Sequence, residues 1–321
     1  MRRRDVITGL SAMAVWPCPA HAQQPTRLYR IGFLRNGPPP RRFTDALREG
    51  LAALGYVEGQ QFRIEYGIAS TSEQLPEVAR ELVGRNVDVI IASGTPPTVA
   101  AKNATSTIPI VFVASIDPLA TGVVESLGRP GGNVTGLAGM HADLMGKRLE
   151  LLKEVLPNLS RVAVLGQAKN PGNAEYIRQA ELAAPALGLD LQILTISSKD
   201  DFERAFQQVQ GLAAAIELDD VLFTSHMDEL VELAVRSRIP VIYAQKEFVR
   251  AGGFMAYGAD LPDQYRRAAA YIDQILKGAS PAHLPVQQPT KHELAINLRT
   301  AEALRIMIPP SLLARADEVI E

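Results

Sequence analysis

An internal repeat at a constant offset is the feature that most constrains the fold of this chain. Residues 29–55 (YRIGFLRNGPPPRRFTDALREGLAALG) and residues 160–188 (SRVAVLGQAKNPGNAEYIRQAELAAPALG) share one plan: a short apolar run, a loop rich in Gly, Pro and Asn, an amphipathic stretch and a closing Ala-Leu-Gly. Pro240 follows Pro109 by 131 residues, which is also the offset between the starts of the two segments. Because a fixed period indicates repeated structural units, we expect two domains with the same architecture.

Both halves alternate apolar runs with amphipathic stretches of helical length. Residues 87–93 (VDVIIAS) and 108–115 (IPIVFVAS) are continuous apolar runs, typical of strands buried on both faces of a parallel sheet. Strands that alternate with helices predict a sheet wrapped by helices on both faces. The sequence therefore predicts an α/β fold with two doubly wound parallel-sheet lobes. Two unrelated Rossmann-like domains with coincidental spacing are the alternative.

The first residues have the pattern of an export signal. Arginines at positions 2–4 precede an apolar run at 6–16 and an Ala-x-Ala cleavage site at 20–22, and the apolar run is too short to span a bilayer. We therefore predict a signal peptide at residues 1–22 and a periplasmic mature chain. The arginine pair at 3–4 fits the twin-arginine pattern, whereas three arginines fit an ordinary Sec signal equally well, so the export route stays open.

Cysteine and charge narrow the possible partners. Cys18 is the single cysteine; it follows Pro17, whereas a lipidated cysteine follows a small residue, and it leaves with the signal. The mature chain then has no disulfide and no thiolate metal site. Lys and Arg number 33 against 35 Asp and Glu in the whole chain, and removing the signal leaves a net charge of about -4. This balance predicts no nucleic-acid partner.

The repeat also predicts where a ligand binds. In open parallel sheets ligands bind beyond the carboxyl ends of the strands, where backbone N–H groups and helix N-termini are exposed. Polar loops rich in Gly and Pro follow the apolar runs in both halves, so we expect them to face one another across a cleft. These loops are residues 35–40, 93–98 and 114–120 in the first half and residues 166–173, 222–228 and 243–248 in the second.

Each candidate in these loops has a structural and a functional interpretation. Thr95 stands before Pro96 and Pro97, which predicts a helix N-cap, while its hydroxyl and that of Ser93 also suit a ligand carboxylate. Asp117 suits a cap or a ligand ammonium, and we favour the ligand.

Two further candidates are open in the same way. Asn170 lies in the turn sequence Asn-Pro-Gly-Asn, so turn formation is favoured over ligand contact. Tyr243 ends an apolar run, where a tyrosine packs in the core or rim more often than it forms a platform for a ligand.

Catalytic and cofactor motifs are absent from the sequence. The chain has no G-x-S-x-G elbow, phosphate-binding loop, H-E-x-x-H or G-x-G-x-x-G after the first apolar run. Residues 128–136 (GRPGGNVTG) follow a helix-like stretch rather than a strand, so we interpret them as the approach to a domain crossover. No histidine of the mature chain belongs to a metal-like set of His and carboxylate residues at helical spacing. We therefore predict no catalytic residue, no metal and no cofactor.

Three segments carry a resemblance to a known family. Residues 129–136 (RPGGNVTG), 251–258 (AGGFMAYG) and 284–301 (LPVQQPTKHELAINLRTA) resemble the ABC-transporter substrate-binding proteins that include tryptophan- and tyrosine-binding members. The likeness covers nearly the whole mature chain and implies a type I periplasmic-binding fold and a binding protein rather than an enzyme.

The resemblance also implies domain boundaries and ligand contacts. Lobe 1 is expected at residues 28–137 and about 262–292, and lobe 2 at 138–261 and about 293–321. The predicted ligand-binding residues are Ser93, Gly94, Thr95, Ser115, Asp117, Asn170, Asp220 and Tyr243.

One segment departs from the family pattern. Residues 211–225 (GLAAAIELDDVLFTS) are shorter by about two residues, and Glu217 stands where an apolar residue is expected. Either the strand is shifted or Glu217 faces the cleft. Which of residues 219–226 contact the ligand depends on which alternative holds. The ligand specificity can therefore differ from that of the aromatic amino-acid binders.

The predicted function is that of an exported, monomeric receptor of an ABC importer. It would bind a small ligand, such as an amino acid or an aromatic or aliphatic carboxylate, between its lobes and deliver it to an ABC permease. One alternative is a ligand-sensing receptor for a sensor kinase or chemoreceptor. Another is an exported enzyme, which requires His226 within hydrogen-bond reach of Ser225 or Ser93 with a carboxylate behind it.

Overall fold

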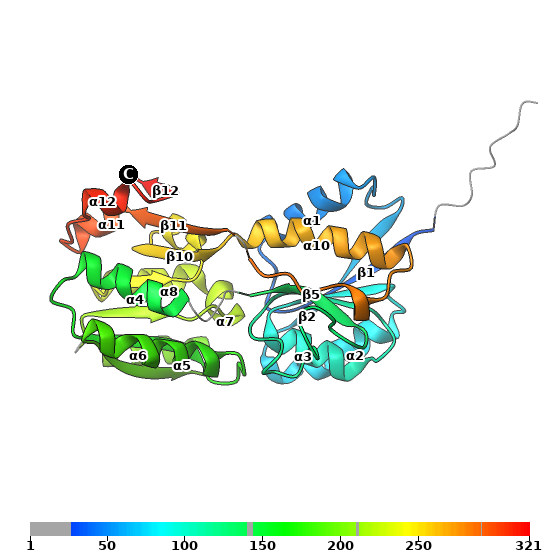
Figure 1. Ribbon diagram of the computed structural model, residues 1–321, viewed down its shortest axis with the longest axis horizontal. Coiled ribbons are helices and arrows are strands. Elements are labelled where there is room, and N and C mark those ends of the chain that lie inside the picture. The colour runs from blue at the N-terminus through cyan, green and yellow to red at the C-terminus, as the bar shows by residue number, and fades with distance from the viewer. Residues whose placement is uncertain (1–26, 140–143, 210–211, 290) are drawn as a thin grey trace, which may run out of the picture.

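The computed structural model describes residues 27–139, 144–209, 212–289 and 291–321. The predicted signal peptide at residues 1–22, with its twin-arginine pattern and Cys18, lies outside the described residues. Figure 1 shows two lobes side by side, each a sheet covered by helices on both faces.

Lobe 1 is built on a five-stranded parallel sheet of order β2-β1-β3-β4-β5. Alternate residues of its central strands enter two separate cores: Ile31 and Phe33 pack with α1 and α10, whereas Leu34 packs with α2 and α3. Figure 1 shows these helix pairs on opposite faces of the sheet. The elements of lobe 1 are β1 (Tyr29–Asn36), α1 (Arg41–Ala53), β2 (Phe62–Ala69), α2 (Leu75–Gly84), β3 (Val89–Ser93), α3 (Thr95–Ala104), β4 (Ile110–Ser115), β5 (Val134–Ala138) and α10 (Leu261–Leu276).

Lobe 2 is built on a seven-stranded sheet of order β12-β11-β10-β9-β8-β6-β7. All pairings are parallel except that of β10 with β11. The elements of lobe 2 are α4 (Leu144–Val155), β6 (Arg161–Gln167), α5 (Asn173–Ala183), β7 (Asp190–Ile196), α6 (Phe202–Val209), β8 (Ala214–Glu217), α7 (Val221–Ser225), α8 (Met227–Arg236), β9 (Val241–Tyr243), α9 (Lys246–Arg250), β10 (Met255–Ala259), β11 (His292–Asn297), α11 (Leu298–Ala303), α12 (Pro310–Leu313) and β12 (Glu318–Ile320). Short 3₁₀ helices lie at Ser72–Gln74, Ala184–Leu187, Lys199–Asp201 and Pro281–His283.

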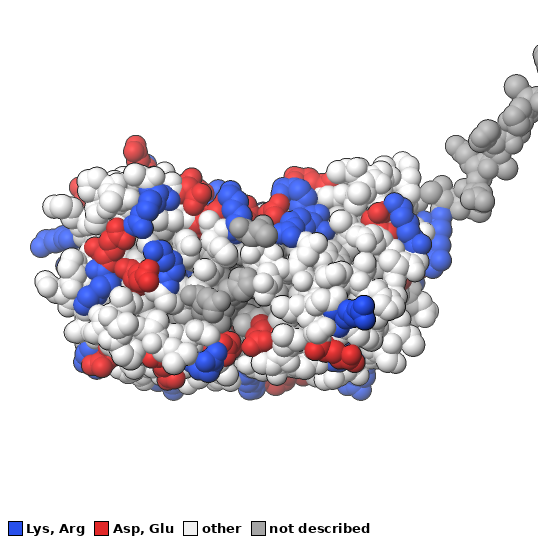
Figure 2. Space-filling model, viewed as in Figure 1, with Lys and Arg blue, Asp and Glu red and all other residues white. Residues whose placement is uncertain are grey.

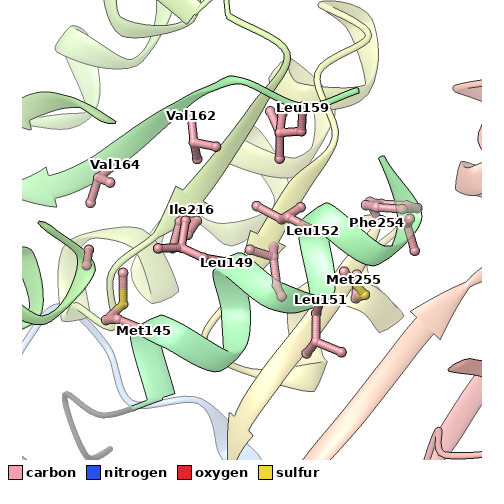
Figure 3. Close-up of a cluster of buried hydrophobic side chains, with 14 of the residues drawn as sticks. Met145, Leu149, Leu151, Leu152, Leu159, Val162, Val164, Ile216, Phe254 and Met255 are labelled. Carbon is pink, nitrogen blue, oxygen red and sulfur yellow. The ribbon is translucent and has the colours of Figure 1, made fainter. Parts of the chain in front are cut away.

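The two faces of the second sheet also have separate cores. Met145, Leu149 and Leu152 of α4 pack on Val162 and Ile216 of the sheet, as Figure 3 shows. The opposite face is covered by α6, α7, α8 and α9. Burial of these apolar side chains stabilises each lobe by roughly 25 cal/mol per Å² removed from water.

The repeat seen in the sequence is a repeat of topology. The order β7-β6-β8-β9-β10 in lobe 2 matches β2-β1-β3-β4-β5 in lobe 1. The predicted α/β fold with two doubly wound lobes is therefore confirmed. Lobe 2 has in addition the antiparallel strand β11 and the edge strand β12, which have no counterpart among the described strands of lobe 1, where a single bridge from Gln287 pairs with β5.

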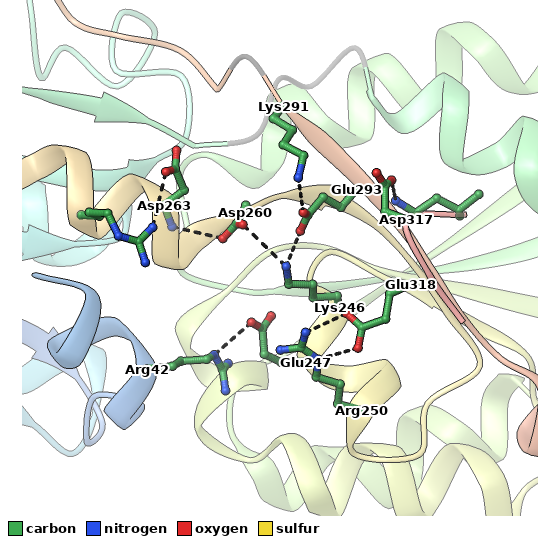
Figure 4. Close-up of polar contacts among 12 residues, drawn as sticks. Arg42, Lys246, Glu247, Arg250, Asp260, Asp263, Lys291, Glu293, Asp317 and Glu318 are labelled. Carbon is green, nitrogen blue, oxygen red and sulfur yellow. Dashed lines mark hydrogen bonds and ion pairs between the residues drawn. The ribbon is translucent and has the colours of Figure 1, made fainter. Parts of the chain in front are cut away.

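The chain passes between the lobes three times, after β5, between β10 and α10, and before β11. Lys246 of α9 lies beside two of these passages, because its Nζ is 3.6 Å from Asp260, between β10 and α10, and forms an ion pair with Glu293 near the start of β11 (Figure 4). On the face shown in Figure 2, charged side chains of both signs are interspersed and gather at the upper edge of the boundary between the lobes.

Candidate functional site

A cavity lies between the lobes at the carboxyl ends of the strands, where the repeat predicts a ligand site. The space between its atoms is ≈ 380 Å³, of which ≈ 30 Å³ admits the centre of a water molecule. We call it the interlobe cavity. Its lining from lobe 1 is Arg35, Phe43, Ser93, Gly94, Thr95, Pro96, Ala114, Ile116, Leu261 and Tyr265, and its lining from lobe 2 is Asn170, Asp219, Asp220, Val221, Thr224 and Gln245.

Arg35 is the principal cation of the cavity, and the sequence analysis did not select it. Its side chain, 1% exposed, extends from the end of β1. Nη1 donates to Ser93 Oγ at 3.3 Å and Nη2 donates to Thr224 Oγ1 at 2.9 Å. Among the described residues Nε has no hydrogen-bond partner, and the negative charges of Asp219 and Asp220 across the cavity favour the charged guanidinium. Burial lowers the pKa of Arg35 below its ordinary value, since removal from water disfavours a charge.

A signal for Arg35 was present in the strand pattern. Ile31 and Phe33 are buried on the face of β1 that packs on α1 and α10. Arg35 continues that alternation and lies over the ring of Phe43, with 5.6 Å from Cζ to the ring centroid. A charged residue that continues the buried face of a strand requires a partner or a function.

The lobe 1 wall of the cavity is aromatic and hydroxylic. Tyr265 stacks on Phe43 with ring centroids 4.8 Å apart, and its hydroxyl is hydrogen-bonded to Ser93 Oγ at 2.5 Å. Burial raises the pKa of Tyr265 above its ordinary value, so the phenol stays protonated at neutral pH. Of the predicted ligand-binding residues, Ser93 therefore lines the cavity and supports the guanidinium of Arg35.

The start of α3 differs from the prediction by one residue. Gly94, rather than Thr95, is the N-cap, with φ of +91°, and Thr95 is the first helical residue. Thr95 Oγ1 accepts a hydrogen bond from Ile116 N at 2.8 Å. The cap is a glycine because the backbone is left-handed there and because a Cβ would lie 3.1 Å from Val221 Cγ2 of the other lobe. Both residues line the cavity.

Asp219 and Asp220 form an acidic wall contributed by lobe 2. Asp220 caps α7, because Oδ1 accepts from Leu222 N at 2.7 Å, and Oδ2 accepts from Asn170 Nδ2 at 2.6 Å. Asp219 Oδ1 accepts from Gln245 Nε2 at 2.7 Å. Burial raises the pKa of Asp219, and it raises the pKa of Asp220 to about 6. The hydrogen bonds described for both carboxylates come from neutral donors, while the positive charge of Arg35 partly offsets the cost of burying them.

Asn170 has both of the roles considered in the sequence. Its Oδ1 accepts from Gly172 N at 3.0 Å, which is the predicted turn. Its Nδ2 holds Asp220 at the cavity, and Asn170 is itself part of the lining.

Ser115, Asp117 and Tyr243 lie outside the lining. Asp117 Oδ1 accepts from Ala120 N at 3.0 Å and so caps a turn. Tyr243 is fully buried on β9 and stacks on Phe248 at 4.6 Å between centroids. Ser115 is buried at the end of β4. The geometry does not bring these three side chains to the cavity, and ligand contact by them stays a sequence prediction.

Glu217 neither faces the cavity nor interrupts its strand. It ends β8, which pairs with β6 and β9 in continuous register. Its buried Oε2 accepts from Ala244 N at 2.9 Å inside lobe 2, and Arg148 Nη1 donates to its backbone oxygen at 3.0 Å. Burial raises the pKa of Glu217 well above its ordinary value.

The arrangement required by the enzyme alternative is not formed. His226 Nδ1 lies 3.0 Å from the backbone oxygen of Leu222, and the hydroxyl of Ser93 is bonded to Tyr265 and Arg35. In the described part of the chain, no cluster of three His, Cys, Asp or Glu side chains could hold a metal ion.

The lobes touch around the cavity, so the cleft is closed. Besides the bond from Arg35 to Thr224, Arg42 Nε of α1 lies 3.1 Å from Glu247 Oε1 of α9 (Figure 4). Lys169 of lobe 2 forms an ion pair with Glu73 of lobe 1. A ligand in the cavity would be sequestered from bulk water in this state.

Comparisons with known proteins point to one group. Residues 36–320 match the model of a family described as "ABC transporter substrate binding protein". The chain is 27% identical over 258 residues to the tyrosine-binding protein of Clostridioides difficile (strain R20291), covering 80% of this chain and 74% of that protein.

Two solved structures are similar over almost their whole length. A conserved domain protein from Vibrio cholerae is 31% identical with a TM-score of 0.85, covering 92% of this chain and 99% of that one. An ABC domain in complex with L-Trp from Streptococcus pneumoniae is 25% identical with a TM-score of 0.85, covering 91% and 99%.

Proposed function

The chain belongs to the family of ABC transporter substrate-binding proteins, and we propose that it is the exported receptor of an ABC importer for an amino acid. The family match confirms the resemblance found in the sequence. The predicted type I periplasmic-binding fold is confirmed by the two-lobed topology and by the similarity to solved structures.

The observation that carries the proposal is the pairing of charges across the interlobe cavity. Arg35 enters from lobe 1, and Asp219 and Asp220 enter from lobe 2. A buried charge without an opposite partner is costly. A zwitterionic ligand supplies both partners at once, its carboxylate to the Arg35 guanidinium and its ammonium to Asp220 or Asp219.

The polar atoms that face the cavity support this orientation of the ligand. Arg35 Nε is a buried donor that has no acceptor among the described residues, and a guanidinium binds a carboxylate with charge-assisted hydrogen bonds. Gln245 Oε1 is likewise buried without a hydrogen bond in the described chain, which suits a ligand N–H. Thr95 and the start of α3 face the same space and favour negative charge nearby.

The relatives support the same ligand class. The name of the Clostridioides difficile protein specifies tyrosine, and the Streptococcus pneumoniae structure contains L-Trp. We extend to this chain the class of ligand, an amino acid, and not those two side chains.

Closure of the lobes is the signal that a membrane partner would read. A ligand held by Arg35 on one side and Asp220 on the other joins the lobes and favours the closed state, and an ABC permease would then receive it. The predicted signal at residues 1–22 supports a periplasmic location. In the part of the chain that the structure describes, no helix is long and apolar enough to cross a membrane. Because the cavity is complete within one chain, the receptor is proposed to act as a monomer.

The proposal is tested by ligand screening of the chain from residue 23 onward, refolded to remove bound ligand. A ligand at 100 times its Kd stabilises the folded state by about 2.7 kcal/mol, so thermal shifts with the protein amino acids should reveal a stabiliser. Calorimetry then compares that amino acid with the acid that lacks its amine and with the amine that lacks its carboxylate. Each should bind at least about tenfold more weakly, since each omits one charged contact. Equal binding of the acid contradicts the ammonium site.

Three matched variants test whether Asp220 binds the ammonium. Asp220→Asn should weaken binding by about tenfold or more. Asp117→Asn should leave binding nearly unchanged if the cavity geometry is right, and weaken it if the sequence prediction is right. Asp200→Asn, at an exposed position, controls for a general loss of charge.

A further inference from the structure

We propose that the interlobe cavity selects an amino acid with a small aliphatic side chain and excludes indole and phenol rings. This inference rests on the proposed function and narrows its ligand. It is carried by how closely the lobes approach one another around the cavity and by which side chains fill it.

The lobes are in contact on more than one side of the cavity. Arg35 Nη2 reaches Thr224 at 2.9 Å. A Cβ at Gly37 would lie 2.4 Å from Ser225 Oγ, and a Cβ at Gly94 would lie 3.1 Å from Val221 Cγ2. Both glycines have positive φ. Gly37 and Ser225 stand outside the cavity lining, so their contact limits how far the lobes can approach. Gly94 and Val221 do line the cavity, and their contact leaves little space for a ring between α3 and α7.

The free volume agrees with these contacts. Water centres have access to ≈ 30 Å³ of the cavity, and one water needs roughly 10–15 Å³ by this measure. The space is therefore that of a few small atoms. An amino-acid head group with a short side chain enters with a slight separation of the lobes. An aromatic side chain requires a separation that breaks the bond from Arg35 to Thr224.

The cavity cannot be widened by moving its lobe 1 wall. Phe43 is 1% exposed and stacks on Tyr265, which in turn stacks on Phe33 with centroids 6.0 Å apart. Ser93 holds the Tyr265 hydroxyl. These rings belong to the core between the first sheet and helices α1 and α10, so their displacement costs buried apolar contacts.

The lobe 2 wall is fixed in a different way. Val221 and Thr224 stand on α7, and that short helix is capped by Asp220, which Asn170 also holds. The remaining apolar lining consists of aliphatic groups that suit a methyl or isopropyl side chain: Pro96, Ala114, Ile116, Val221 and Leu261.

The test is a calorimetric panel on the refolded chain with glycine, alanine, serine, valine, leucine, phenylalanine, tyrosine and tryptophan. Alanine or valine should bind at least 100-fold more tightly than tyrosine and tryptophan. Tyrosine or tryptophan binding as tightly as the small amino acids overturns the size selection and leaves the proposed function standing. Binding of no amino acid overturns the proposed function, and this inference with it.

Variants identify the residue that sets the limit. Phe43→Ala should raise the affinity for leucine or phenylalanine at least tenfold relative to that for alanine, because it removes a ring from the wall. Phe112→Ala is the matched control, since Phe112 is a fully buried ring on the opposite face of the same sheet. It should destabilise lobe 1 without changing the ratio of affinities. An unchanged ratio in a folded Phe43→Ala or Phe43→Leu variant contradicts the assignment.

Discussion

Arg35 Nη2 donates a 2.9 Å hydrogen bond to Thr224 Oγ1, which joins two residues 189 positions apart on opposite lobes. The bond exists only when the lobes are closed. It places a buried cation in the wall of the interlobe cavity, within reach of a ligand that would also contact Asp220.

Replacement of Arg35 should separate ligand binding from folding. Arg35→Met retains a long side chain and removes the buried charge. Ligand affinity should fall about 10- to 100-fold, because a hydrogen bond to a charged group contributes about 1.5–3 kcal/mol. The stability of the ligand-free protein should change little, because the relief of burying the guanidinium opposes the loss of its hydrogen bonds to Ser93 and Thr224 and of its attraction to Asp219 and Asp220. Calorimetry and thermal unfolding of the same samples check both, and unchanged affinity excludes Arg35 from the site.

Ligand affinity should depend on pH through Asp220. Burial raises the pKa of its carboxyl to about 6, so the ligand-free protein protonates Asp220 as the pH falls below 6. A ligand ammonium binds the ionised form, so binding near pH 6 releases a proton. Affinity should therefore fall by up to about tenfold from pH 6.5 to pH 5. In Asp220→Asn the affinity should be lower and this dependence lost. A wild-type affinity independent of pH contradicts the ammonium contact.

The free energy of unfolding of the ligand-free protein should change with pH in the opposite direction to the ligand affinity. The folded pKa of Asp220 is raised from 3.8 to about 6, so the folded state binds more protons than the unfolded state between these values. Its contribution to the free energy of unfolding then falls as the pH rises through about 4 to 6, by up to about 3 kcal/mol. Asp219 and Glu217 shift in the same direction. Chemical unfolding across this range should give a smaller pH dependence for Asp220→Asn than for the wild type. An equal dependence would show that Asp220 is not its cause.

Particular elements show how much of the fold could be predicted from the sequence. The matching segments and their constant offset, such as that from Pro109 to Pro240, predicted two doubly wound lobes of the same architecture, because alternating strands and helices form a parallel sheet with helices on both faces. The strand order within each sheet was not predicted. The C-terminal antiparallel strand β11 was not predicted, since its partner β10 is chosen by the third passage between lobes.

The site was predicted less completely, for a physical reason. Five of the predicted ligand-binding residues line the interlobe cavity, and their contact with a ligand stays a prediction: Ser93, Gly94, Thr95, Asn170 and Asp220. Which strand-end side chains cross to the other lobe depends on loop conformation and on the contact between lobes, and neither is encoded in spacing. Asp117 was favoured, although its carboxylate caps a turn, while Arg35 was passed over.

The ion pair between Arg42 and Glu247 should set the closed population without touching the ligand. Its atoms lie 3.1 Å apart, with side chains 31% and 6% exposed, and both stand outside the cavity lining. Glu247→Gln should weaken ligand binding by about two- to tenfold, since the pair stabilises only the closed state. A double-mutant cycle with Arg42→Gln, read by calorimetry, isolates the coupling. Additive effects of the two substitutions would exclude the pair as a stabiliser of closure.

A crystal structure of the refolded chain with the amino acid that binds most tightly in the screen tests the central claim most directly. The account predicts that the ligand lies between the closed lobes, with its carboxylate hydrogen-bonded to the guanidinium of Arg35 and its ammonium to Asp220 or Asp219. A ligand bound elsewhere, or bound between the lobes with neither Arg35 nor these carboxylates in contact, would contradict it.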